Sequence, residues 1–260
     1  MQLTPLVKRI LIAWTALWVL GFLTGISGGG LNSWLALDVV GLSNFEFGSL
    51  PGILGYTLVH DRLGIFHLLF NAYLFALFAP EIEVLFPKKH FLIYLLKASL
   101  AGAVATLLCW WVIGGAFGAP VIGGSGLVAA VLASSAAMYP NRVMNLILIR
   151  VKLLHLFLVV VGLDLMYFIG NLFGEFEGVA RIIHLVGALT GWLAVGGFHR
   201  FDGPWRGWME KSARKKADKQ QRQSQKDEAE LDRILAKISK DGLPSLTDAE
   251  RRFLEQRSKR

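Results

Sequence analysis

The chain has 260 residues, of which 54% are hydrophobic and only 18% are charged, and its mean hydropathy is +0.50. A soluble domain of this size would carry about 25% charged residues, so the composition excludes an ordinary soluble protein. The net charge of +8 lies largely in the segment 201–260 and beside apolar segments. The positive-inside bias of membrane proteins explains this excess better than nucleic-acid binding. A single cysteine, Cys109, excludes an intrachain disulfide and a cysteine-based metal cluster.

Six apolar segments are each close to the roughly 20 residues that cross about 30 Å of hydrocarbon. In chain order they are 7–27, 64–86, 91–113, 122–139, 144–169 and 180–199. The segment 28–63 is interrupted by Gly, Pro and Asn, and we expect an apolar loop lying partly in the membrane interface. Residues 1–200 are therefore predicted to form an all-α membrane domain with six transmembrane helices.

Residues 201–260 differ sharply, because Lys, Arg, Glu and Asp dominate them. Apolar residues recur at helical spacing from Leu231 to Ile238, and Thr247 with Glu250 has the spacing of a capping box. We expect a basic helical extension in water, with a small pair of helices. The sequence assigns it no role beyond contact of its basic residues with the membrane surface.

The placement of Lys and Arg predicts how the segments cross the membrane. Basic residues flank one set of segment ends: Lys8, Arg9, Lys88, Lys89, Arg142, Arg150, Lys152, Arg200 and Arg206. The other set has only Arg62 and Arg181. Both termini are therefore predicted to be cytoplasmic, and the second, fourth and sixth segments run from the outer face inwards.

Polar residues inside these three segments are site candidates, because such groups are costly in lipid unless they have partners. The second segment carries His67 and Asn71, the fourth opens with Gly123-Gly124-Ser125-Gly126, and the sixth opens with His184. The depth of each group follows from its distance along the chain to the inner end of its segment, at Pro140 for Ser125 and at Arg200 for His184. At about 1.5 Å per residue, both lie about 22–24 Å from the inner edge. His67 and Asn71 belong to the same layer or just above it.

This layer has the chemistry of a serine hydrolase. A histidine at the depth of Ser125 can take the proton of its hydroxyl. Free N–H groups at a helix N-terminus favour a developing oxyanion, and the side chains of His67 and Asn71 can add donors. No Asp or Glu is spaced to complete a triad in this layer, so a Ser–His dyad is predicted. Asp164 is a single aspartate without a partner, which we expect to be structural.

Small residues are expected to bring the two reacting groups together. Gly187 and Gly191 form a small-xxx-small ridge on the sixth segment, which lets it approach the fourth segment closely. Gly123 and Gly126 flank Ser125 and leave its backbone accessible. There is no His-Glu-x-x-His motif, so neither a metal nor another cofactor is predicted. Lys97 and His155 have no assigned role.

Taken together, His67-xxx-Asn71, Gly123-x-Ser125-Gly126 and His184-xx-Gly187-xxx-Gly191 resemble the signature of rhomboid intramembrane serine proteases. The resemblance covers about residues 1–200 and includes Glu83, which matches an acidic position twelve residues past the Asn. It implies hydrolysis of transmembrane protein substrates by Ser125 as nucleophile and His184 as general base. It also implies an oxyanion hole from His67, Asn71 and the Ser125 amide, with lateral access of substrate beside the fifth helix and beneath a cap loop at about 170–180. The resemblance further implies a bacterial inner-membrane location.

The sequence departs from the family pattern at three places. Ala129 replaces an aromatic residue four positions after the serine, Ile183 replaces an Ala before the histidine, and the first loop lacks a Trp-Arg pair. Two other classes of protein remain open: a catalytically weak or inactive rhomboid-like protein that binds membrane clients, and a transporter or channel. Neither the substrate nor the oligomeric state follows from the sequence.

Overall fold

The structure of the protein is a computed structural model that describes residues 3–25, 30–146, 149–173, 180–196, 221, 228–240, 242 and 245–258. Most of the predicted cap loop, 174–179, lies outside the described residues. The chain divides into two compact units, residues 1–202 and 203–260, and each is described by itself.

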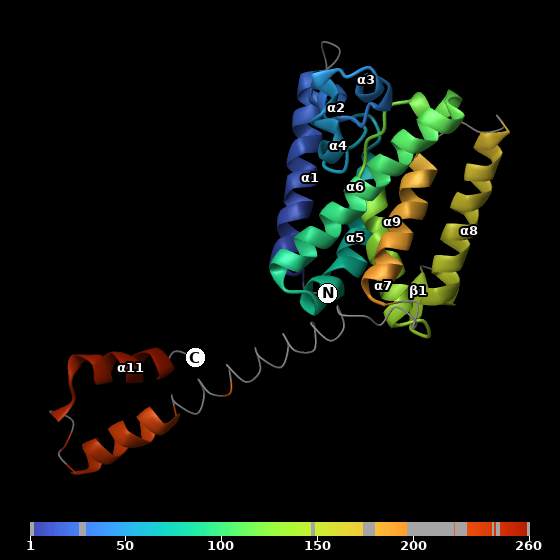
Figure 1. Ribbon diagram of the computed structural model, residues 1–260. Helices are drawn as coiled ribbons and strands as arrows, with labels where there is room; N and C mark the ends of the chain where they lie inside the picture. Colours follow the sequence, from blue (N-terminus) through green and yellow to red (C-terminus); the bar gives the residue numbers. More distant parts are fainter. Residues whose placement is uncertain are drawn as a thin grey trace. The chain divides into compact units, whose positions relative to one another are not determined.

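The first unit is a bundle of six apolar helices (Figure 1). They are α1 (Pro5–Thr24), α5 (Ile65–Leu85), α6 (Lys88–Ile113), α7 (Ser125–Met138), α8 (Leu153–Leu172) and α9 (Ala180–Ala194). Four of them, α1, α5, α6 and α8, are long and apolar enough to cross a membrane, whereas α7 and α9 are shorter. The prediction of a helical membrane domain is therefore confirmed, and within the described residues full-length spans are found for four of the six predicted segments.

Helix α7 lies inside the bundle and packs against α5, α6, α8 and α9. It has only 14 residues, and every residue from Gly126 to Ala136 is buried. At about 1.5 Å per residue it is about 21 Å long. Protein rather than lipid surrounds it, so irregular backbone before its first turn can lie at membrane depth.

A β-hairpin occupies the beginning of the fifth predicted segment, so the prediction of a helix over 144–169 is wrong at its start. Strands β1 (Val143–Leu146) and β2 (Ile149–Lys152) pair antiparallel, with Val143 opposite Lys152. Helix α8 begins only at Leu153, whose N–H donates to the Arg142 carbonyl at 2.8 Å. Most hairpin residues are apolar, and Arg150 and Lys152 are its only charged residues, so average hydropathy does not separate the hairpin from the helix. In the hairpin, polar Asn145 lies opposite Arg150, which places two polar residues together at one pair.

The loop between α1 and α5 is a structured element at the opposite end of the bundle from the hairpin (Figure 1). Its short helices are α2 (Gly30–Leu35), α3 (Val39–Ser43), η2 (Phe47–Ser49) and α4 (Gly52–Gly55). Phe45 and Phe47 are almost fully exposed. Large apolar side chains exposed at this end fit the predicted position in the membrane interface.

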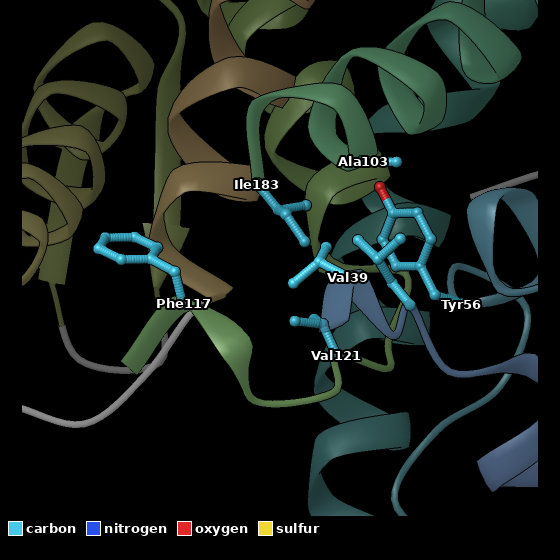
Figure 2. Close-up of a cluster of buried hydrophobic side chains, with 7 residues drawn as sticks. Val39, Tyr56, Ala103, Phe117, Val121 and Ile183 are labelled. Atoms are coloured by element: carbon cyan, nitrogen blue, oxygen red, sulfur yellow. The ribbon is translucent and has the colours of Figure 1, made fainter. Parts of the chain in front are cut away.

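A cluster of buried side chains joins this loop to the helices around it (Figure 2). Its members come from the loop, α6, the segment before α7, and α9: Leu37, Val39, Tyr56, Ala103, Phe117, Val121 and Ile183. The Tyr56 hydroxyl donates to the Ser99 carbonyl of α6 at 2.9 Å. Burial raises the pKa of Tyr56 to about 12, so the hydroxyl stays protonated and remains a donor. The cluster fixes the loop against the residue that precedes His184.

The buried carboxylate of Glu83 holds the beginning of α1. It accepts hydrogen bonds from the N–H groups of Leu6 and Val7, at 3.1 and 2.8 Å, and from the Thr4 hydroxyl. These N–H groups would otherwise have no intrahelical partner, and a negative charge is favourable at a helix N-terminus. Glu83 thereby attaches the first helix to the end of α5.

The second unit contains a pair of helices, residues 228–240 and α11 (Asp248–Ser258). Buried Glu250 joins them, because its carboxylate accepts from Arg233 and Lys237 of the first helix. The Thr247 N–H donates to Glu250 at 2.8 Å, as in a capping box. The Thr247 backbone, then Lys237, lowers the pKa of Glu250 to about 2. The predicted helical pair is therefore present in this extension.

Candidate active site

The hydroxyl of Ser125 and the ring of His184 are in hydrogen-bond contact. Ser125 is the first residue of α7, and His184 lies in the first two turns of α9. The distance from His184 Nε2 to Ser125 Oγ is 2.7 Å. The His184 side chain is 19% exposed, so the pair is partly shielded and still reachable.

This contact depends on a very close approach of α7 and α9. A Cβ atom at Gly187 would lie 2.3 Å from the Gly126 carbonyl oxygen, and one at Gly191 would lie 2.0 Å from the Ala130 carbonyl oxygen. Real Cβ atoms do not approach oxygen so closely, so only glycine fits at either position. Ile183 fills the space beside Gly126, where a Cβ atom would lie 2.6 Å from its Cγ2. The bulk of Ile183 is thus accommodated by a missing side chain on α7.

His67 and Asn71 border the backbone that leads into Ser125. Both lie on α5, and a Cβ atom at Gly123 would lie 2.8 Å from His67 Cε1 and 3.9 Å from Asn71 Nδ2. Gly123 has a φ of +127°, a conformation that side chains rarely allow. Asn71 is only 3% exposed, and its Nδ2 has no hydrogen-bond partner among the described residues. A buried amide without a partner is costly, and this one lies beside Gly123, two residues before Ser125.

The backbone before Ser125 is held by the structured loop rather than by its own neighbours. Leu37 and Val121 exchange two N–H···O bonds of 2.9 and 3.1 Å. The Gly123 N–H donates to the Tyr56 carbonyl at 2.8 Å, and the Gly124 N–H donates to His60 Nε2 at 3.3 Å. These bonds fix the depth at which α7 begins.

His60 is a residue of this site that sequence reasoning missed. Its side chain is fully buried, and its ring lies 5.0 Å from Trp14 and 5.4 Å from His67, centroid to centroid. Burial, then the neighbouring His67, lowers the pKa of His60 to about 4. A neutral ring is required to accept from Gly124, so its proton is on Nδ1. The available signal was a third histidine just before α5, close to His67 in the chain.

Asp164 is not the isolated aspartate that the sequence predicted. Its carboxylate lies 3.1 and 3.2 Å from His184 Nδ1 and accepts a 2.9 Å bond from Arg181. The Asp164 side chain is 6% exposed. The prediction that it has no partner is wrong, and so is the prediction that no carboxylate lies in the layer of Ser125. The side chains of Lys97 and His155, in contrast, are exposed.

Among the residues that the structure describes, no group of three or more His, Cys, Asp or Glu side chains is placed to hold a metal ion. The polar groups around Ser125 instead have the arrangement of a hydrolase: a hydroxyl, a ring nitrogen in contact with it, and a buried amide donor beside it.

Long apolar helices and this polar layer together define a polytopic helical membrane protein. The family model of the Rhomboid domain matches residues 49–201, and the chain therefore belongs to the rhomboid family of intramembrane proteases, as its motifs predicted. A second match covers residues 215–260, to a family of unknown function (DUF6576). A comparison with curated proteins finds no match to the chain.

Proposed function

We propose that the protein is an intramembrane serine endopeptidase in which Ser125 is the nucleophile and His184 is the general base. The observation that carries this proposal is the 2.7 Å contact between Ser125 Oγ and His184 Nε2 inside a membrane domain. A serine hydroxyl is a weak nucleophile until a positioned base accepts its proton. That distance is within the range for direct transfer.

The reaction would proceed through a serine ester. Ser125 Oγ forms a bond to the carbonyl carbon of the scissile peptide while its proton moves to His184 Nε2. The same proton is then given to the leaving amine as the C–N bond breaks. Water, deprotonated by His184, hydrolyses the ester and restores the serine.

An oxyanion hole would lie between α5 and the start of α7. The unpaired Nδ2 of Asn71, the ring of His67 and the Ser125 N–H at the helix N-terminus are the candidate donors. Such donors act on the charge that develops in the transition state and therefore raise turnover rather than substrate affinity.

A fluorophosphonate probe tests the proposal, since it reacts covalently with activated serine hydroxyls. We expect the purified protein to be labelled and to cleave a model transmembrane substrate, and Ser125→Ala to do neither. The matched control is Ser135→Ala, which removes a buried hydroxyl without a partner among the described residues of the same domain. It should retain labelling and cleavage. Labelling of Ser125→Ala equal to that of the wild type would refute the assignment, and an unlabelled, inactive wild type would favour the client-binding alternative.

We further propose that both termini face the cytoplasm of a bacterial cell and that residues 201–260 form a cytoplasmic domain. The support is the basic residues at one set of helix ends, among them Lys8, Lys88 and Arg150. A reporter fused after Arg260 should be active only in the cytoplasm, and periplasmic activity would contradict this orientation.

A further inference from the structure

Asp164 lies where the third member of a serine-protease triad would lie. Its two carboxylate oxygens are 3.1 and 3.2 Å from His184 Nδ1, on the side of the ring opposite the nitrogen that contacts Ser125. It is on α8, so three separate helices contribute the three side chains. The side chain is buried, at 6% exposure, so water does not compete strongly for the ring N–H.

The contact determines which ring nitrogen carries the proton. An ionised carboxylate only accepts hydrogen bonds, so His184 Nδ1 must donate to Asp164. In the neutral ring, Nε2 then has a free lone pair, and it is this nitrogen that faces the Ser125 hydroxyl. The tautomer required for a general base is therefore the one that Asp164 selects.

Arg181 holds the carboxylate in place from the first turn of α9. Its guanidinium donates to Asp164 Oδ1 at 2.9 Å and lies over the Tyr167 ring, 4.6 Å from the centroid. The buried negative charge thus has a permanent counter-ion, which a buried carboxylate requires. Oδ2 is left to His184 alone among the contacts of the described residues.

We propose that Asp164 is a positioning residue that completes a Ser125–His184–Asp164 triad in this protein. It orients the ring, keeps the proton on Nδ1, and stabilises the imidazolium formed when Nε2 takes the serine proton. Asp164 itself stays ionised throughout, and the proton returns from Nε2 to the leaving amine. The inference rests on the proposed function, because an orienting carboxylate matters only if His184 acts as a base.

Three variants separate positioning from mere packing. Asp164→Asn keeps the shape but replaces the acceptor-only carboxylate, so the ring can adopt the wrong tautomer. Arg181→Gln breaks the other ion pair of Asp164 and leaves its contact with His184. The matched control is Gly162→Ala, on the same helix as Asp164, where a new Cβ atom would meet nothing within 4 Å. The double variant Asp164→Asn, Arg181→Gln removes both charges, so no unpaired guanidinium remains to destabilise the fold. Full-length protein in proteoliposomes is assayed for kcat and KM on a transmembrane substrate, for fluorophosphonate labelling of Ser125, and for its melting temperature.

We expect Asp164→Asn and the double variant to lose about 10²–10⁴-fold in kcat, in line with loss of the orienting aspartate in serine proteases. KM should change by less than about threefold, because the carboxylate does not touch the substrate. Labelling of Ser125 should slow in parallel with kcat. Arg181→Gln, which loosens the carboxylate but leaves it in contact with His184, should lose less kcat than Asp164→Asn, and Gly162→Ala should keep the wild-type kcat.

Two results would overturn the triad. One is a kcat of Asp164→Asn within tenfold of the wild type. The other is equal losses of kcat in Asp164→Asn and Arg181→Gln that follow their melting temperatures. Both leave the wild type labelled and active, so the proposed function would stand. A wild type that neither labels nor cleaves would instead refute the function itself, and the triad with it.

Discussion

Replacing Gly191 with Ala should separate α7 from α9 and reduce catalysis without touching any reacting group. The new Cβ atom would lie 2.0 Å from the Ala130 carbonyl oxygen, and ordinary contact begins at 3.4 Å. The two helices must therefore move apart by roughly the difference between these two distances. His184 is two turns from Gly191 on the same helix, so a shift of this size lengthens its 2.7 Å contact with Ser125.

The expected losses of turnover and of stability follow from the size of that displacement. A misplacement of about 1 Å costs on the order of 10²-fold in rate, and overpacking of this kind typically costs about 1–3 kcal/mol of stability. Gly162→Ala is the matched control, since a Cβ atom there would meet nothing within 4 Å on helix α8. It should stay active and melt at or above the wild-type temperature, because Ala favours a helix by about 1 kcal/mol over Gly.

The assay is turnover of a transmembrane substrate in proteoliposomes, with fluorophosphonate labelling of Ser125 as a second measure. Gly191→Ala should lose both roughly in parallel, while still melting cooperatively. Wild-type turnover and labelling by Gly191→Ala would show that the close approach of the helices is not what sets the Ser125–His184 distance.

Three further outcomes are expected. Asn71→Ala should lower kcat by about 10²–10³-fold with little change in KM; cleavage within twofold of the wild type at an unchanged melting temperature would remove Asn71 from the oxyanion hole. The pKa of His60 is lowered in the folded protein from 6.5 to about 4. Neutral His60 therefore contributes fully to the free energy of unfolding above pH 6.5, and this contribution falls by up to about 3 kcal/mol as the pH drops from 6.5 towards 4. His60→Gln, whose amide oxygen can still accept from Gly124, should melt with a flatter dependence over this pH range, and identical pH profiles would contradict the role of His60. Deleting residues 201–260 should leave proteolysis in detergent largely intact, because every proposed reacting group precedes them; loss of activity with a folded core would make the extension part of the mechanism.

Counting residues from each polar group to the inner end of its segment predicted which helices carry the site, because the depth of a residue in the membrane follows from its distance along the helix to that end. Ser125 and His184 were expected at one depth, and the structure has them in contact. The family and the helical membrane domain are confirmed. The positions of His67 and Asn71 next to Gly123 are compatible with the predicted oxyanion hole, which remains a proposal.

The same counting failed for Asp164, and the hairpin is the reason. With a span assumed to begin at 144, Asp164 would lie about 30 Å from the inner end. Because β1 and β2 take up the first residues, α8 begins at Leu153, and Asp164 lies only about 16 Å above that point. Ser125 lies about 20 Å above the end of α7 by the same measure. Because most hairpin residues are apolar, the hairpin was counted as part of the span, and this placed Asp164 too far from the inner end.

His60 was missed for a different physical reason. It lies in a loop, where a polar residue is unremarkable, and only the fold shows that the loop turns inwards to meet Gly124. Helical periodicity has no means of predicting that contact, because it carries no information about how an irregular segment folds.

The described bonds that hold Ser125 and the backbone before it join residues far apart in the chain. Gly124 is bonded to a ring 64 positions earlier, and Ser125 to one 59 positions later. During synthesis, Ser125 therefore emerges well before His184, the base proposed for it. A chain interrupted before α9 contains Ser125 without His184, so the contact between them forms only with the last helix of the bundle. The proposed proteolysis would therefore begin only once the last helix of the bundle is in place.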